Sequence, residues 1–420
     1  MIQILILSVF ALFAGLMLSR KVPAILAVPA MAVAIAAVVR TPLSTILDRI
    51  VSAGATRLAD AYMMVFAGAV LGRVIMQTGI AEAVIKRAAE FGGDRPLAVS
   101  LTIMAAVALL FTGLFGLGAI IMVGGLALPI MISIGVPRKL AGVLFLLAFA
   151  LGFVFNIGMW GFYQKALGLD PGTIRHFAAA LVVVDGLGIA VFVAIASRRM
   201  NSYAAWASAE SGSSPGESRR DVPAWALAVP VLPLVLHIGF GWQVVPSFLA
   251  CALAGCLLTA PGKAVKQLAS AAVKGLEDVA PAIILMIGIG MLLNATTLPA
   301  VQESLRPAVQ SIPFRDPIAY VLFFGLLSPL ALYRGPLNPY GIGIGVYSLI
   351  GSLGLLPPLA LLAAVMSVVQ VQNVCDPTNT SNVWVANQVG MRVEEITRMT
   401  LAYKVVVCIA GLLVGALMYL

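Results

Sequence analysis

The sequence QNVCDPTNTSN, from Gln372 to Asn382, lies between two apolar runs in the C-terminal half of the chain. Within it Pro377 lacks an amide donor, and Asp, Asn and Thr side chains tend to bond to nearby backbone instead of supporting a helix or a strand. In a soluble protein such a stretch would be a surface loop. The rest of the chain indicates instead that it interrupts a membrane-spanning helix.

The chain as a whole is too apolar for an aqueous fold. Hydrophobic residues make up 61% of it, charged residues 10%, and its mean hydropathy is +1.05, whereas soluble domains carry about 25% charged residues. Apolar runs of about 20 residues, the length that a membrane helix needs, recur throughout. The sequence does not show the shorter alternating segments of an outer-membrane barrel. It therefore predicts an all-α polytopic membrane protein.

The charged and metal-binding residue types exclude several functions. The formal net charge is +9, but the basic residues form no Lys/Arg-rich run, and in short loops of membrane proteins such residues orient the helices. We therefore expect no nucleic-acid partner. The four cysteines stand singly and there are two histidines, so we expect no disulfide framework, no metal centre and no cofactor.

Breaks in the apolar runs recur in two halves of the chain. The apolar runs of the first half are 2–19, 22–39, 58–78, 96–134 with a break at 113–118, a run from 140 that breaks at Asn156, and 176–196. The break at 113–118 falls opposite 334–339 in the second half, and Asn156 falls opposite 373–375. Interrupted spans at corresponding places in two halves are typical of secondary transporters and point to the substrate site.

This repeat predicts a domain organisation. We expect residues 1–196 to form the first repeat, residues 197–221 a hydrophilic linker, and residues 222–420 the second repeat. If 96–134 and 317–353 each enter and leave the membrane on one side, each half crosses about five times and the second half is inverted. The distribution of basic residues then places the linker in the cytoplasm. It does not distinguish a re-entrant hairpin from one that spans the membrane fully.

The second hairpin carries an arginine at its expected tip. Arg334 is followed by Gly335, and the prolines and glycines around them forbid an unbroken helix. A guanidinium at this place suits a substrate carboxylate, which it can bind through two parallel hydrogen bonds. We expect Gly335 and Asn338 of the same loop to contribute to the substrate site. The alternative is that Arg334 pairs with Asp376 and only fastens two loops together.

The opening stretch offers a carboxylate, amides and hydroxyls at membrane depth. Asp376, Thr378, Asn379 and Thr380 stand beside backbone groups that a broken helix leaves free, and such groups coordinate ions and anionic substrates. We expect Thr378, Asn379 and Thr380 to bind substrate, and Asp376 with Asn382 to couple transport to an ion. Asp376 would carry a proton, or ligate sodium together with Asn379. The alternative is that these residues cap the half-helix that follows.

Asn156 occupies the corresponding break of the first half. Its neighbours are much more apolar than those of Asn373 in the second half, so the polar residues are distributed unequally between the two breaks. We expect both Asn156 and Asn373 to face the substrate. The alternative for Asn156 is a hinge cap, which would use its side chain to satisfy backbone amides at the start of a helix.

Several other charged residues fall in or beside apolar runs. Asp185 falls opposite Lys404, and an ion pair between these two residues stays an open alternative. We expect Arg73 and Lys404 to extend along the helix surface to the cytoplasmic edge of the membrane. Asp60 and Asp278 are expected to begin spans and to complement the helix dipole there.

The chain resembles the ion transporter superfamily of organic-anion permeases, nearest to the gluconate:proton symporters and the citrate and dicarboxylate carriers. The resemblance rests on two halves with a hairpin and a broken span each, and on the turn from Asp376 to Asn382, which is similar to the Asn-Thr turns of that superfamily. The first half lacks a Ser-Asn-Thr sequence around Asn156, which favours proton over sodium coupling. The resemblance implies a homodimer that works by elevator-like alternating access.

These observations predict a secondary transporter of the inner membrane that carries a small organic carboxylate by symport with protons or sodium. The alternative is a cation/proton antiporter in which Asp376 binds the cation. We do not expect an enzyme, because the sequence contains no Walker A, GxSxG or HExxH motif.

Overall fold

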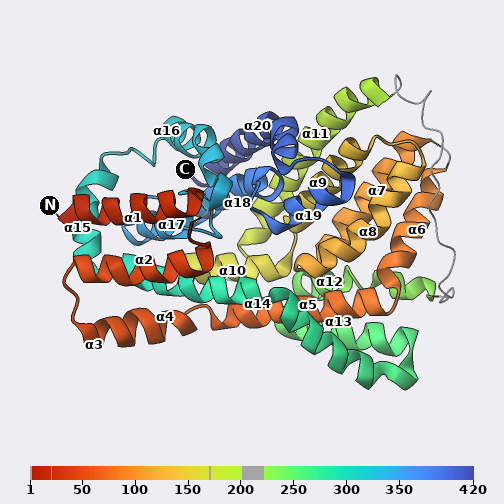
Figure 1. The fold of residues 1–420 in the computed structure, drawn as a ribbon, viewed down its shortest axis with the longest axis horizontal. Coiled ribbons are helices and arrows are strands. Elements are labelled where there is room, and N and C mark those ends of the chain that lie inside the picture. Colours follow the sequence, from red (N-terminus) through yellow and green to blue (C-terminus); the bar gives the residue numbers. More distant parts are fainter. Residues whose placement is uncertain (1, 20, 94, 170–171, 201–221) are drawn as a thin grey trace.

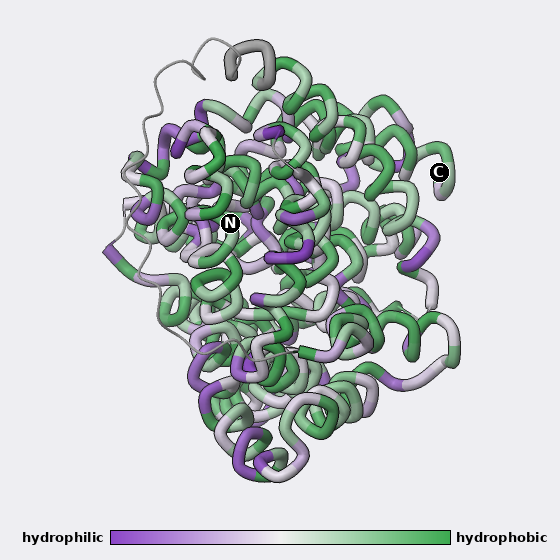
Figure 2. Tube along the Cα trace, turned by 90° about the vertical axis from the view of Figure 1, so that its right-hand side faces the viewer, coloured by the Kyte–Doolittle hydropathy of each residue, from purple (hydrophilic) through white to green (hydrophobic). Residues whose placement is uncertain are grey.

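A computed structural model describes residues 2–19, 21–93, 95–169, 172–200 and 222–420 of the chain (Figure 1). Every regular element within these ranges is a helix. Apolar residues run along most of the trace (Figure 2) and many large apolar side chains are exposed on the outside. The prediction of an all-α membrane protein is confirmed.

The first half contains the helices α1 to α11. They are α1 (Ile2–Leu18), α2 (Ala24–Val38), α3 (Leu43–Thr45), the π-helix η1 (Ile46–Ser52), α4 (Ala53–Thr56), α5 (Ala59–Gln77), α6 (Ile80–Gly92), α7 (Pro96–Phe111), α8 (Leu117–Ser133), α9 (Arg138–Phe153), α10 (Ile157–Leu167) and α11 (Ile174–Met200). The predicted breaks at 113–118 and at Asn156 fall between α7 and α8 and between α9 and α10. Helices α9 and α10 meet at an angle of 58°.

The second half repeats this order. Its elements are η2 (Ala224–Ala228), α12 (Leu232–Phe240), α13 (Val244–Thr259), η3 (Pro261–Lys263), α14 (Ala264–Thr296), α15 (Pro299–Gln310), α16 (Pro317–Val321), η4 (Leu322–Leu326), η5 (Ser328–Arg334), α17 (Gly343–Ser352), α18 (Pro358–Cys375), α19 (Thr380–Val389) and α20 (Val393–Tyr419). Helices α11 and α20, which end the two halves, are both 27 residues long. The hairpins over 96–134 and 317–353 and the break at 376–379 lie where the sequence predicts them.

Equivalent helices of the two halves run in opposite directions. Arg57, in the helical run that leads into α5, donates to Asn294 of α14 (2.6 Å), and Arg73, further along α5, donates to Asp278 (2.5 Å). The later residue of α5 therefore meets the earlier residue of α14, so the two helices are antiparallel. This is the relation that an inverted repeat requires.

The last helices of the two halves show the same antiparallel relation. The ring of Phe177 near the start of α11 lies 6.3 Å from that of Tyr419 at the end of α20, and the ring of Phe192 lies 5.1 Å from that of Tyr403. Helix α14 also packs on α2 of the first half, while α5 of the first half packs on α13. The two halves therefore interlock, and neither forms a separate bundle.

Six helices in the described ranges are long and apolar enough to cross a membrane, or seven if α9 and α10 together count as one span. The protein is thus a multi-pass membrane protein. Helices α1 and α2 have only 17 and 15 residues, fewer than the usual span of about 20. They count as shorter apolar helices by length, and the crossing of the membrane by 2–19 and 22–39 stays a prediction.

The start of the predicted linker is helical. Helix α11 continues to Met200, so residues 197–200 belong to the last helix of the first half. The rest of the predicted linker, residues 201–221, lies outside the described residues, and its cytoplasmic location stays a prediction.

Candidate functional site

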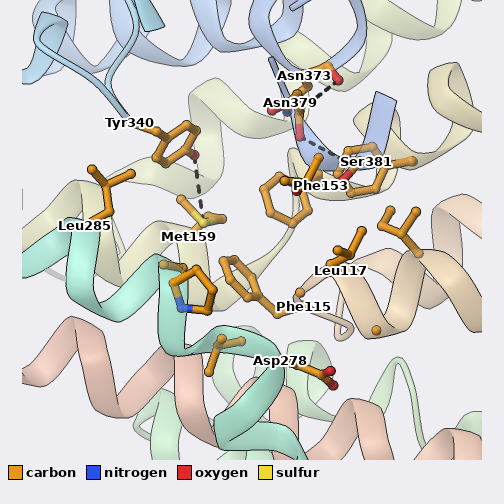
Figure 3. Close-up of a pocket in the computed structure, with 18 of the residues that line it drawn as sticks. Phe115, Leu117, Phe153, Met159, Asp278, Leu285, Tyr340, Asn373, Asn379 and Ser381 are labelled. Atoms are coloured by element: carbon orange, nitrogen blue, oxygen red, sulfur yellow. Dashed lines mark hydrogen bonds between the residues drawn. The ribbon is translucent and has the colours of Figure 1, made fainter. Parts of the chain in front are cut away.

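A cavity of about 520 Å³ lies where both helix breaks, both hairpins and α14 converge (Figure 3). One wall is polar and belongs to the second half: Arg334, Tyr340, Gln372, Asn373, Asn379, Thr380 and Ser381. Figure 3 shows Asn373, Asn379 and Ser381 on this wall and Asp278 across the cavity from them, with Phe115, Phe153 and Met159 between. The cavity therefore joins a polar wall to an aromatic and aliphatic middle.

Arg334 lines this cavity with a half-buried side chain. Its Nη1 donates to the backbone oxygen of Tyr340 at 3.0 Å. No carboxylate of the described residues lies within 4.0 Å of the guanidinium, so the ion pair with Asp376 that the sequence left open is not formed. An arginine has five N–H donors in a planar fork, and this fork has donors left for a ligand in the cavity.

Asp376 is fully buried and lies behind the polar wall, outside the set of residues that line the cavity. Its Oδ1 accepts hydrogen bonds from the backbone N of Tyr333 (2.9 Å) and from both the backbone N (2.9 Å) and the hydroxyl (2.7 Å) of Thr378. Its Oδ2 accepts from Nδ2 of Asn338 at 3.2 Å. The carboxylate thus connects the α18–α19 break to the tip of the second hairpin.

Three further residues of the predicted site also lie behind the wall: Gly335, Asn338 and Asn382, whereas Thr378 lines a second cavity on the other side of Arg334. Asn338 is fully buried and bonds to Ala331, Asp376 and Tyr340. Asn382 donates to the backbone oxygens of Val374 and Asp376 at 3.0 Å. The side chains of Asn338 and Asn382 therefore fix the shape of the two loops and do not line the cavity.

Asn379 and Thr380 do line the cavity, at the start of α19. The side chain of Asn379 accepts from the backbone N of Ser381 at 3.2 Å and donates to the backbone oxygen of Asn373 at 3.3 Å. Asn379 is therefore the N-cap of α19, as the capping alternative has it, and it also forms part of the cavity wall, while its contact with substrate stays a prediction. The amide end of α19 faces the cavity, where it favours an anionic group.

Asn156 is buried and does not line the cavity. It caps α10 by accepting from the backbone N of Met159 (3.2 Å) and donates to the backbone oxygens of Phe111 and Leu114, both at 2.9 Å. These contacts match the hinge-cap alternative. They fasten the first break to the tip of the first hairpin.

Two cavity-lining amides have an atom without a partner among the described residues. Oε1 of Gln372 and Nδ2 of Asn373 make no hydrogen bond with the described residues. Both residues are buried, at 2% and 3% exposure, so bulk water does not satisfy these atoms. A buried polar atom without a partner is unfavourable unless a ligand or water satisfies it. Gln372 was missed by the sequence analysis. Its position beside Asn373, in the last turn before the break, was the available signal.

Arg73 does not extend to the membrane edge as predicted, because it pairs with Asp278 through two hydrogen bonds of 2.5 Å. Asp278 also does not begin a span, since it lies well inside α14. Both residues line the cavity, and Figure 3 shows Asp278 across from the polar wall. The carboxylate packs on Gly118 of the first hairpin, where an added methyl group would lie 2.5 Å from a carboxylate oxygen.

Lys404 likewise does not reach the membrane edge. Its Nζ donates to Asp185 of α11 at 2.6 Å, and both side chains are almost completely buried, at 1% and 0% exposure. The ion pair that the sequence left open is therefore the correct interpretation. Asp60 does lie in the first turn of α5, where it forms an exposed ion pair with Lys165.

A second cavity, of about 380 Å³, shares Pro281, Leu285 and Arg334 with the first. The end of α1, at Met17, and residues 22–25, which lead into α2, line it. Arg334 therefore stands between two adjacent cavities, within reach of a ligand in either of them.

Substituting Gly118 with alanine is expected to reduce several-fold the transport that the sequence predicts, because the new methyl group would displace the Asp278 carboxylate and with it the bond to Arg73. The matched control is Gly125→Ala on the same helix, where an added methyl group meets nothing within 4 Å. Uptake by purified variants in liposomes would measure both effects. Equal uptake by the two variants would show that the contact between the hairpin tip and α14 is not needed.

The fold is that of an all-α multi-pass membrane protein with two interlocked repeats. A solved structure, that of the Alcanivorax borkumensis YdaH transporter, which is described as having an unusual topology, is similar to it with a TM-score of 0.57 and 14% sequence identity. The similarity covers 91% of this chain and 89% of that chain. It shows a shared fold. No protein-family profile and no curated protein sequence matches the chain.

Proposed function

We propose that the protein is a secondary transporter that moves a small organic carboxylate across the inner membrane by ion-coupled symport. The observation that carries this proposal is Arg334, a cavity-lining guanidinium without a carboxylate partner among the described residues. Beside it lie the unpaired amide atoms of Gln372 and Asn373. A cation, an amide donor and an amide acceptor at one wall match a carboxylate that also bears a hydroxyl or amino group.

Transport, rather than binding alone, is supported by the architecture. Broken helices in antiparallel repeats that meet at a central cavity are typical of alternating-access transporters. The similar structure is that of a protein described as a transporter. We extend the proposal to a homodimer with elevator-like movement, as the resemblance to the organic-anion permeases implies.

The substrate class follows from both parts of the cavity. The polar wall suits the gluconate, citrate and dicarboxylate types that the resemblance implies, through Arg334, Asn373, Asn379 and Thr380. The middle of the cavity is lined by residues such as Phe115, Phe153 and Met159, which would contact an apolar part of a larger carboxylate. A ligand panel therefore has to include aliphatic and aromatic monocarboxylates beside the sugar acids and dicarboxylates.

The coupling ion is a proton or sodium. A cation/proton antiporter, the alternative, would place the cation on Asp376. Oδ1 of that carboxylate already accepts three hydrogen bonds and Oδ2 accepts one, so a cation would bind at Oδ2 or displace Tyr333 or Thr378 from Oδ1. We favour symport because the guanidinium of Arg334 and the amide end of α19 supply positive charge to the cavity, which suits an organic anion better than a cation.

A thermal-unfolding screen of organic acids, with and without sodium, is expected to identify at least one stabilising carboxylate. Binding to the folded state stabilises it by about 2.7 kcal/mol at a ligand concentration of 100 times Kd. The acid found in this way should then enter liposomes that contain the protein when a pH gradient is imposed. Collapse of the pH gradient by sodium alone, with no organic acid present, would establish the antiporter instead.

A further inference from the structure

Two consecutive residues at the tip of the second hairpin adopt a left-handed backbone conformation. Tyr333 has φ 56° and ψ 33°, and Arg334 has φ 59°. Residues other than glycine avoid this region because the Cβ atom approaches the backbone too closely. Of the described non-glycine residues, only Arg40 shares the positive φ. Such strain persists only where the surroundings enforce it.

The surroundings that enforce this conformation come from the α18–α19 break. The backbone N of Tyr333 donates to Asp376 at 2.9 Å. The same carboxylate binds Asn338, which in turn donates to the backbone oxygen of Ala331 (2.8 Å) and accepts from the backbone N of Tyr340 (2.9 Å). One buried carboxylate thus holds both ends of the tip.

We propose that Asp376 is a positioning residue that holds Tyr333 and Arg334 in the left-handed conformation and so keeps the Arg334 guanidinium in the cavity. The proposal rests on the proposed function, in which Arg334 binds the substrate carboxylate. Asp376 lies outside the cavity lining and both its oxygens accept hydrogen bonds, so it acts on the substrate through Arg334. Without this carboxylate, Tyr333 would return to a right-handed or extended conformation and carry Arg334 away.

A glycine at position 333 tests whether Asp376 acts by holding the backbone conformation or by binding ion or substrate directly. Glycine adopts the left-handed conformation without the Cβ penalty. Asp376→Ala is expected to weaken binding of gluconate, citrate and malate, each measured by calorimetry, by 10-fold or more for every one of them that binds the unaltered protein. Adding Tyr333→Gly to Asp376→Ala should recover most of that loss.

The matched control is Leu332→Gly in the Asp376→Ala background. Leu332 has an ordinary φ of −67°, so a glycine there adds flexibility at the same tip without relieving strain, and it should not recover binding. Failure of Tyr333→Gly to recover affinity, or equal recovery by Leu332→Gly, would overturn the proposal. The first result would assign Asp376 a direct contact with ion or substrate.

Hydrogen exchange of the tip tests the same proposal without any ligand. Exchange of the backbone amides between Gly335 and Gly341 is expected to accelerate in Asp376→Ala and to slow again in the double variant with Tyr333→Gly. If no acid of the full panel, monocarboxylates included, binds the unaltered protein, the substrate proposal fails, while the exchange pattern still decides the role of Asp376. Unchanged exchange in Asp376→Ala would overturn that role.

Discussion

Substituting Arg334 with alanine is expected to abolish carboxylate uptake while the protein stays folded. The guanidinium lines both cavities, and hydrogen bonds to charged groups contribute about 1.5–3 kcal/mol each. Loss of two such bonds raises Kd on the order of 100-fold or more. Within the protein the side chain makes one hydrogen bond, to the backbone of Tyr340, and its charge also acts on the buried carboxylate of Asp376, so the variant should be less stable than the unaltered protein but still folded.

Two further variants test whether the loss of uptake is specific to the guanidinium of Arg334. Arg334→Lys keeps the charge but not the planar fork, so it should retain weak binding and lose selectivity for carboxylates. Arg87→Ala removes an exposed arginine of α6 and should transport normally. The measurements are uptake into liposomes and the unfolding temperature in detergent. Full uptake by Arg334→Ala would show that Arg334 does not bind the substrate.

Breaking the buried ion pair between Lys404 and Asp185 is expected to have the largest effect on stability. Removing one partner of such a pair destabilises a protein by about 3–5 kcal/mol, because the other charge stays buried without compensation. Oδ2 of Asp185 has no partner among the described residues, so the carboxylate of a Lys404→Met variant would lose its only strong contact. The unfolding temperature should fall sharply and the yield of folded protein with it.

The double variant Lys404→Met with Asp185→Leu tests whether the pair itself or the unpaired charge matters. Replacing both partners with apolar residues is often neutral or stabilising, so this variant should regain most of the lost stability. Lys165→Met breaks an exposed pair with Asp60 and should shift the unfolding temperature far less. A Lys404→Met protein as stable as the unaltered one would contradict the prediction.

Much of the architecture could be predicted from the sequence because glycine and proline mark helix breaks directly. The hairpins and the breaks at Asn156 and Asp376 lie at the positions that glycine, proline and the capping side chains predict. The partner of Arg73 could not be predicted, and that of Lys404 was predicted only as an alternative, since both partners come from the other half of the chain. A charged residue in an apolar run signals that a partner exists, but only the antiparallel packing of equivalent helices identifies it.

The candidate site was predicted in part. Arg334, Asn373, Asn379 and Thr380 line the cavity, and a charged or polar group at membrane depth was a sufficient signal for them. The sequence did not show which members of the two loops face the cavity. That depends on the left-handed backbone at Tyr333, which turns Arg334 towards the cavity while Asn338 and Asp376 bond to each other behind the wall.

Both buried or half-buried ion pairs join residues from different halves, 205 and 219 positions apart in the chain. As the ribosome delivers the first half, Arg73 and Asp185 enter the bilayer before their partners have been made. An unpaired charge of this kind in a membrane helix is unfavourable by about 2.5–3.5 kcal/mol. The newly made first half would therefore stay loosely inserted, a target for membrane proteases, until α14 and α20 arrive to neutralise it.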